Sequence, residues 1–160
     1  MFIRFVQKII LALGVAFSLL ASSAVVSQVI NAHSLPVQQS PRYLADIRVN
    51  TKAELTQLLR RAESLFDQGK FNAGKDQPVA FVLHGPEARS LLVENYSTNK
   101  VLVDLAARLT AFQVVDIQVC EGWMKSRGVE KDDLPPFIGS VSLGPVEKKR
   151  LIKEEGYVYF

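Results

Sequence analysis

The largely apolar run from Val114 to Val119 constrains the fold of this chain more than any other stretch. It is rich in β-branched residues, which is typical of a buried strand, and it ends at Cys120, the single cysteine among 160 residues. The residues that follow, as far as Gly128, favour a short helix. The sequence therefore predicts a thiol at a strand-to-helix turn, where the N–H groups of the coming helix favour the reactive thiolate.

A lone cysteine also has a plainer interpretation. Free cysteine is among the most buried residue types and commonly acts as a small hydrophobic side chain. Glu121 opposes thiolate formation, whereas Lys125 and Arg127 support it if their side chains fold back. Trp123 either forms a wall over the thiol or contributes core area. Cys120 is thus either a reactive thiol or a packing residue.

Strand-like and helical segments alternate from residue 43 onward. The predicted strands cover residues 43–49, 78–83, 113–120, 137–143 and 157–160. The predicted helices lie in residues 52–68, 87–94, 98–109, 121–127 and 145–155. Thr51 and Glu54 form a capping box that opens the first helix. This order predicts a single-domain α/β fold, in which a mainly parallel sheet of about five strands has helices on both faces.

His84 and Cys120 stand at the carboxyl ends of two predicted strands. Such ends line one edge of a parallel sheet, and binding sites form in the crevice there. We therefore expect a thiol and an imidazole at this edge, with Gly85 in the turn after His84. Alternatively, His84 is a turn residue that hydrogen-bonds a loop carbonyl. A Cys-His-Asp hydrolase also stays open, because Asp116 supplies an acid.

The sequence lacks the residue patterns that nucleotide binding, zinc binding and dithiol exchange usually require. Neither the P-loop nor the dinucleotide-binding glycine spacing occurs. One cysteine and one well-placed histidine fall short of a zinc site, and there is no Cys-x-x-Cys pair for dithiol exchange. We therefore expect neither a metal nor a cofactor.

Residues 1–24 have the features of an export signal. Arg4 and Lys8 precede an apolar run over residues 9–20, and a small-residue cleavage site follows at residues 22–24. Cleavage would release the protein into the periplasm, whereas an uncleaved segment would anchor it in the membrane, facing the periplasm. A lone thiol in that oxidising compartment also permits an intermolecular disulfide.

The remaining chain is close to neutral. Residues 25–42 are expected to form a flexible leader, and residues 43–160 the folded domain. Without Arg4 and Lys8, 17 basic residues face 16 acidic ones, so the net charge falls from +3 to +1. That balance gives no electrostatic reason to expect nucleic acid as a partner.

Three stretches occur in a characteristic order: Val82–Pro86, Val119–Gly128 and Gly144–Tyr159. With them, residues 43–160 resemble the DsrE/DsrF-like family, small α/β proteins that handle sulfur. The resemblance implies that Cys120 accepts sulfur as a persulfide and passes it on. It also implies sulfur donor and acceptor proteins as partners, and assembly into a homo-oligomer.

Two functional hypotheses follow. The first is an exported sulfur carrier or sulfurtransferase in which Cys120 and His84 are the catalytic residues. The other residues expected around this site are Gly85, Glu121, Trp123 and Lys125. The second is a ligand-binding or assembly module without catalytic activity, in which Cys120 only packs.

Overall fold

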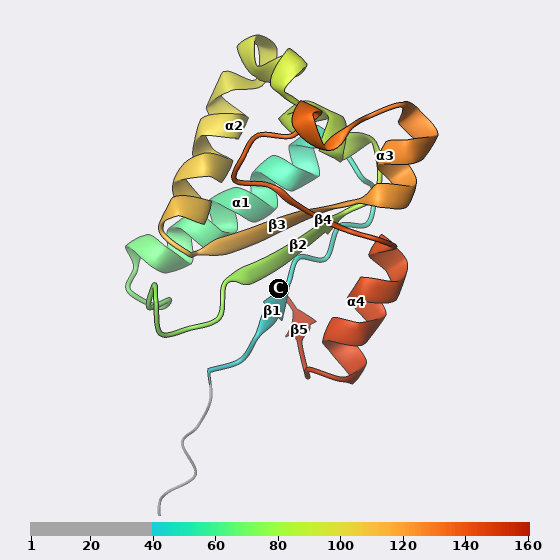
Figure 1. Cartoon of the computed structure of the whole chain (residues 1–160). Coiled ribbons are helices and arrows are strands. Elements are labelled where there is room, and N and C mark those ends of the chain that lie inside the picture. The colour runs from blue at the N-terminus through green and yellow to red at the C-terminus, as the bar shows by residue number, and fades with distance from the viewer. Residues whose placement is uncertain (1–39) are drawn as a thin grey trace, which may run out of the picture. The chain divides into compact units, whose positions relative to one another are not determined.

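The structure is a computed structural model, and it describes residues 40–160 (Figure 1). The expected export signal, residues 1–24, and residues 25–39 of the expected leader lie outside this described part. Within residues 40–160, no helix is both long enough and apolar enough to cross a membrane.

A five-stranded sheet in the order β4-β3-β2-β1-β5 forms the centre of the described chain. The strands are β1 (Tyr43–Leu44), β2 (Val79–Leu83), β3 (Val115–Cys120), β4 (Gly139–Val141) and β5 (Val158–Tyr159). Every neighbouring pair is parallel, as the sequence predicts. All residues of β2 are buried, because an unbroken apolar run suits a central strand covered on both faces.

Helices cover both faces of the sheet. The α-helices are α1 (Lys52–Asp67), α2 (Tyr96–Ala111), α3 (Glu121–Arg127) and α4 (Gly144–Lys153). The 3-10 helices are η1 (Pro86–Leu91), η2 (Val93–Asn95) and η3 (Lys131–Asp133). Figure 1 shows α1 and α2 together on one face and α4 on the other. The single-domain α/β architecture expected from the sequence is confirmed.

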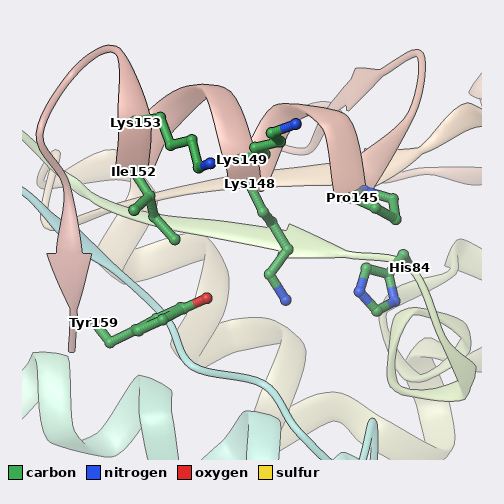
Figure 2. Close-up of a pocket in the computed structure, with 7 residues that line it drawn as sticks. All are labelled: His84, Pro145, Lys148, Lys149, Ile152, Lys153 and Tyr159. Atoms are coloured by element: carbon green, nitrogen blue, oxygen red, sulfur yellow. The ribbon is translucent and has the colours of Figure 1, made fainter.

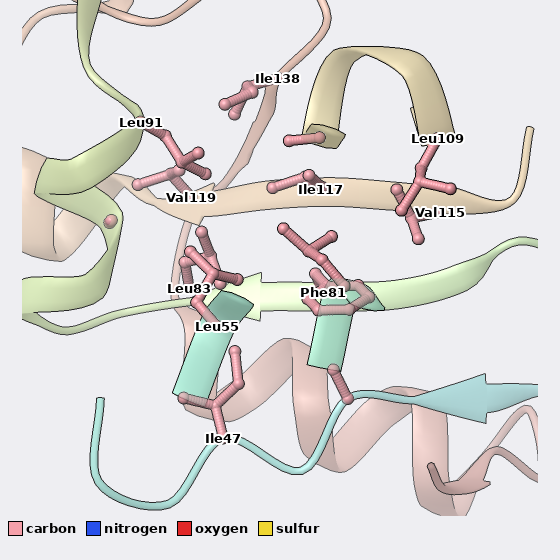
Figure 3. Close-up of a cluster of buried hydrophobic side chains, with 14 of the residues drawn as sticks. Ile47, Leu55, Phe81, Leu83, Leu91, Leu109, Val115, Ile117, Val119 and Ile138 are labelled. Carbon is pink, nitrogen blue, oxygen red and sulfur yellow. The ribbon is translucent and has the colours of Figure 1, made fainter. Parts of the chain in front are cut away.

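Alternate side chains of β2 point to opposite faces of the sheet and belong to two different hydrophobic clusters. Phe81 and Leu83 belong to the larger cluster, which includes residues of α1 and α2 (Figure 3). Ala80 and Val82 belong to a smaller cluster with Leu151 of α4. Because side chains alternate across a strand, one apolar run fills both layers.

Three local predictions need correction. The strand expected over residues 43–49 ends at Leu44, because the Ile47 N–H turns back to donate to the Ala45 carbonyl at 3.1 Å. The strand expected over residues 137–143 is shortened to β4. The helix expected over residues 87–94 is instead two 3-10 turns, η1 and η2, separated by Leu92 in an extended conformation.

The start of α1 differs from a reciprocal capping box. Thr51 Oγ1 accepts the expected hydrogen bond from the Glu54 N–H, at 3.2 Å. The Glu54 carboxylate instead accepts from the N–H groups of Arg48, Val49 and Asn50. Since Asn50 has a positive φ of 52°, the turn before the helix presents these N–H groups to Glu54.

Glu63 of α1 links the two long helices. Its carboxylate accepts a hydrogen bond from Arg60 Nη1 at 2.7 Å and pairs with Arg108 of α2. The Arg60 guanidinium holds the pKa of Glu63 below its usual range despite partial burial, and Arg108 acts in the same direction. A carboxyl whose pKa is lower in the folded state stabilises the fold above its unfolded-state pKa, and this contribution is lost as the pH falls through the folded-state pKa.

Glu63→Gln is therefore expected to lower the free energy of unfolding by about 1 kcal/mol near neutral pH, and by much less at about pH 3. Urea unfolding at the two pH values measures the difference. Glu94→Gln is the control, because Glu94 is exposed and has no ion-pair partner within residues 40–160. An equal loss at both pH values would contradict the assignment.

Candidate functional site

Cys120 ends β3, and its sulfur lies against the start of α4. The N–H of Gly144, the first residue of α4, donates a hydrogen bond to Cys120 Sγ at 3.2 Å. The cysteine is 5% exposed. An N–H donor in this position can stabilise negative charge on sulfur.

The helix that faces the sulfur is not the one that the sequence predicts. Cys120 is the N-cap residue of α3, but its side chain makes no capping hydrogen bond there. The reason lies in the sheet, where Cys120 is in register with Val141 of β4. The chain leaving β4 therefore passes beside Cys120 and brings the Gly144 N–H to its sulfur.

Two glycines shape the space around the sulfur. A Cβ atom at Gly144 would lie 3.1 Å from His84 Cβ and 3.2 Å from Cys120 Cβ, so even alanine would crowd this position. A Cβ atom at Gly122 would lie 3.5 Å from Cys120 Sγ and 3.4 Å from Leu143 Cδ2. Gly122 and Leu143 are exposed, so the sulfur is close to the surface on this side.

His84 lies on the other side of Gly144, at the end of β2. Leu83 of β2 is paired with Val119 of β3, so the residues that follow them, His84 and Cys120, lie at the same edge of the sheet. His84 is half-buried, and its N–H donates to Glu87 Oε1 at 3.1 Å. The hydrogen bond from the backbone N–H of His84 to Glu87, rather than a contact of the imidazole ring, holds the turn that contains His84.

Glu87 is a site residue that the sequence analysis missed. It is the one charged residue fully buried in the described chain, and its Oε1 also accepts from the Gly85 N–H at 3.1 Å. A Cβ atom at Gly85 would lie 2.6 Å from both Asn50 Cβ and Glu87 Oε2, so glycine is required for close packing. Glu87 follows Gly85 and Pro86, and a glutamate in such a turn is normally expected at the surface, so the sequence does not indicate that it is buried.

The other expected site residues lie apart from the thiol or have separate contacts. The Glu121 carboxylate accepts from Ser140 Oγ at 2.8 Å and lies 3.2 Å from Lys131 Nζ. These two contacts, the hydroxyl first, hold the pKa of Glu121 below its usual range. Trp123 is buried in the larger core cluster. Lys125 is exposed and lines a separate surface hollow next to α3.

The structure does not assemble a Cys-His-Asp triad with Asp116. This residue is in register with Ala80 of β2, which comes four positions before His84 in the sequence. Four residues of strand span about 13 Å, which is too far for a hydrogen bond to the ring. Asp116 instead accepts a hydrogen bond from Gln118 Nε2 at 2.7 Å.

The described residues also contain no group of three or more histidine, cysteine or acidic side chains that could hold a metal ion.

Comparison with known proteins supports the fold. No family model matches the chain, and no curated protein matches it. Among solved structures, it is similar to MTH1491, a protein of unknown function from Methanobacterium thermoautotrophicum, with a TM-score of 0.55 and 19% sequence identity. The two chains share a fold. The match covers 76% of this chain and 98% of MTH1491.

Proposed function

We propose that this protein is a sulfur carrier or sulfurtransferase that holds a persulfide on Cys120. The hydrogen bond from the Gly144 N–H to Sγ carries the proposal, because it provides a donor for a negatively charged sulfur. The resemblance of residues 43–160 to the DsrE/DsrF-like family supports the same role. Export to the periplasm, homo-oligomer assembly, and donor and acceptor proteins are further parts of the proposal.

Loading of the thiol needs no outside oxidant. The Cys120 thiolate attacks the terminal sulfur of a polysulfide, forming a new S–S bond as the adjacent S–S bond of the donor breaks. The shortened polysulfide leaves with the electron pair of the broken bond. His84, which lies across Gly144 from the cysteine, is the proposed acceptor of the proton that the thiol releases.

The added sulfur atom needs space, and Gly122 provides it. Only hydrogen stands where a Cβ at this position would approach Sγ to 3.5 Å. Leu143, which borders the same space, is 55% exposed. We therefore infer that the donor approaches past Gly122 and Leu143.

Polysulfide treatment of the reduced full-length protein is expected to add the mass of one sulfur atom, and Cys120→Ser is expected to abolish this addition. Gly122→Ala is expected to slow the addition about tenfold, equivalent to about 1.4 kcal/mol in the barrier. Alanine favours a helix more than glycine does, so this change in α3 should not destabilise the fold. Mass spectrometry over time measures all three proteins.

Thermal unfolding of each variant is the control for folding. If the folded protein gains no sulfur and gains it only after unfolding, Cys120 is a packing residue and the carrier proposal fails. If Gly122→Ala loads as fast as the wild type, the inferred approach of the donor is wrong.

One observation favours the second hypothesis, a binding or assembly module. Cys120 is largely buried and belongs to the larger core cluster. In such a module, Cys120→Ala would retain ligand binding, whereas His84→Ala at the sheet edge would weaken it.

A further inference from the structure

A hollow of about 390 Å³ lies beside His84, between α4 and β5 (Figure 2). We call it the α4 pocket. Its lining residues are His84, Pro145, Lys148, Lys149, Ile152, Lys153 and Tyr159. Three of them are lysines from one helix, and none is acidic. The lining of the α4 pocket therefore carries positive charge.

The lysines of the α4 pocket have no carboxylate partner within residues 40–160. Of the nearby carboxylates, those of Glu147 and Glu155 are paired with Arg150, and the exposed Glu154 does not line the α4 pocket. Lys149 and Lys153 are four positions apart in α4, a spacing at which like charges destabilise a helix. An anion bound in the α4 pocket would relieve this repulsion.

Donors from three separate elements meet in the α4 pocket. Figure 2 shows Lys148 extending from α4 toward the space between His84, which follows β2, and Tyr159 of β5, with the Tyr159 hydroxyl directed into that space. Ammonium, phenol and imidazole groups can all donate hydrogen bonds to oxygen. Pro145 and Ile152 add an apolar wall. This combination suits a ligand with an anionic group and a less polar body.

We propose that the α4 pocket binds a small ligand through a phosphate-type oxyanion. A dianion offsets much of the charge of the three lysines, and its oxygens accept hydrogen bonds from Lys148 and Tyr159. The same chemistry occurs in a free phosphate, in a soluble phosphate monoester and in the headgroup of phosphatidic acid. The proposal does not depend on sulfur transfer at Cys120, although His84 borders both sites.

The test is to titrate the full-length protein with inorganic phosphate and to measure the heat of binding by isothermal titration calorimetry. We expect saturable binding that added sodium chloride weakens, since salt screens partly exposed charges. Lys148→Gln is expected to weaken binding about tenfold. Lys70→Gln is the matched control, because Lys70 is exposed and outside the α4 pocket, and it should leave binding unchanged.

Glycerol phosphate and vesicles containing phosphatidic acid distinguish the sources of the oxyanion. Binding of either soluble phosphate that depends on Lys148 would support a soluble ligand. Binding of vesicles alone, again lost in Lys148→Gln, would support a lipid headgroup. The absence of Lys148-dependent binding to all three probes, or equal weakening by Lys148→Gln and Lys70→Gln, would overturn the proposal. Cys120→Ser should bind phosphate normally, which separates this test from the test of sulfur loading.

Discussion

Phe81→Ala is expected to lower the free energy of unfolding by about 3 to 5 kcal/mol. Phe81 is fully buried in the middle of β2, in register with Ile117 of β3, and Figure 3 shows it inside the larger core cluster. Removing its ring leaves a cavity between the central strands and α1, because closely packed neighbours relax only in part. Urea unfolding followed by circular dichroism measures the loss.

Val101→Ala is the control for this prediction. Val101 is a hydrophobic residue of α2 that is 71% exposed, so its truncation should change stability by less than about 0.5 kcal/mol. A loss below about 1 kcal/mol for Phe81→Ala would contradict the packing of β2 at the centre of the core.

The second large effect is expected at Glu87. Glu87→Ala removes the acceptor of the His84 and Gly85 N–H groups, and the loss should be about 3 kcal/mol because these donors are left without a partner. Glu87→Gln should lose much less, since its side-chain oxygen can still accept both bonds. The new amide also offers a donor near Asn50 Oδ1, which, like Glu87 Oε2, is buried without a partner within residues 40–160.

The contrast between the two substitutions is the decisive measurement. Urea unfolding gives their stabilities, and Glu154→Ala, at an exposed position after α4, is the matched control. If alanine and glutamine destabilise the protein equally, the negative charge of Glu87 matters and its hydrogen bonds to the turn do not.

The sequence was sufficient to predict the central strands and the order of elements. β2 is recognisable because it is apolar without interruption, and α1 because its apolar residues follow helical spacing. The edge strands were less predictable. Tyr43 to Val49 alternates like a strand, but the turn at Ile47 ends β1 after two residues, a contact that no alternating pattern reveals.

The site was predictable only in part. That Cys120 and His84 stand at one sheet edge follows from parallel strands alone. That they are neighbours across Gly144 depends on β2 lying next to β3, and on β3 lying next to β4. Strand order is decided by long-range packing, so the hydrogen bond from Gly144 could not be inferred from the residues around Cys120.

The pairing of β1 with β5 joins segments from opposite ends of the described chain. It closes the largest loop in the sheet, and Val158 and Tyr159 are both exposed, so the burial that offsets the entropy of closure comes mainly from the next residue, Phe160, which lies in the larger core cluster. Amide hydrogen exchange should therefore be faster in β5 than in β2 and β3, whose residues are mostly buried. Local opening of β5 would remove Tyr159 from the α4 pocket while the contact between Gly144 and Cys120 stays in place, so the two sites differ in the free energy needed to open them.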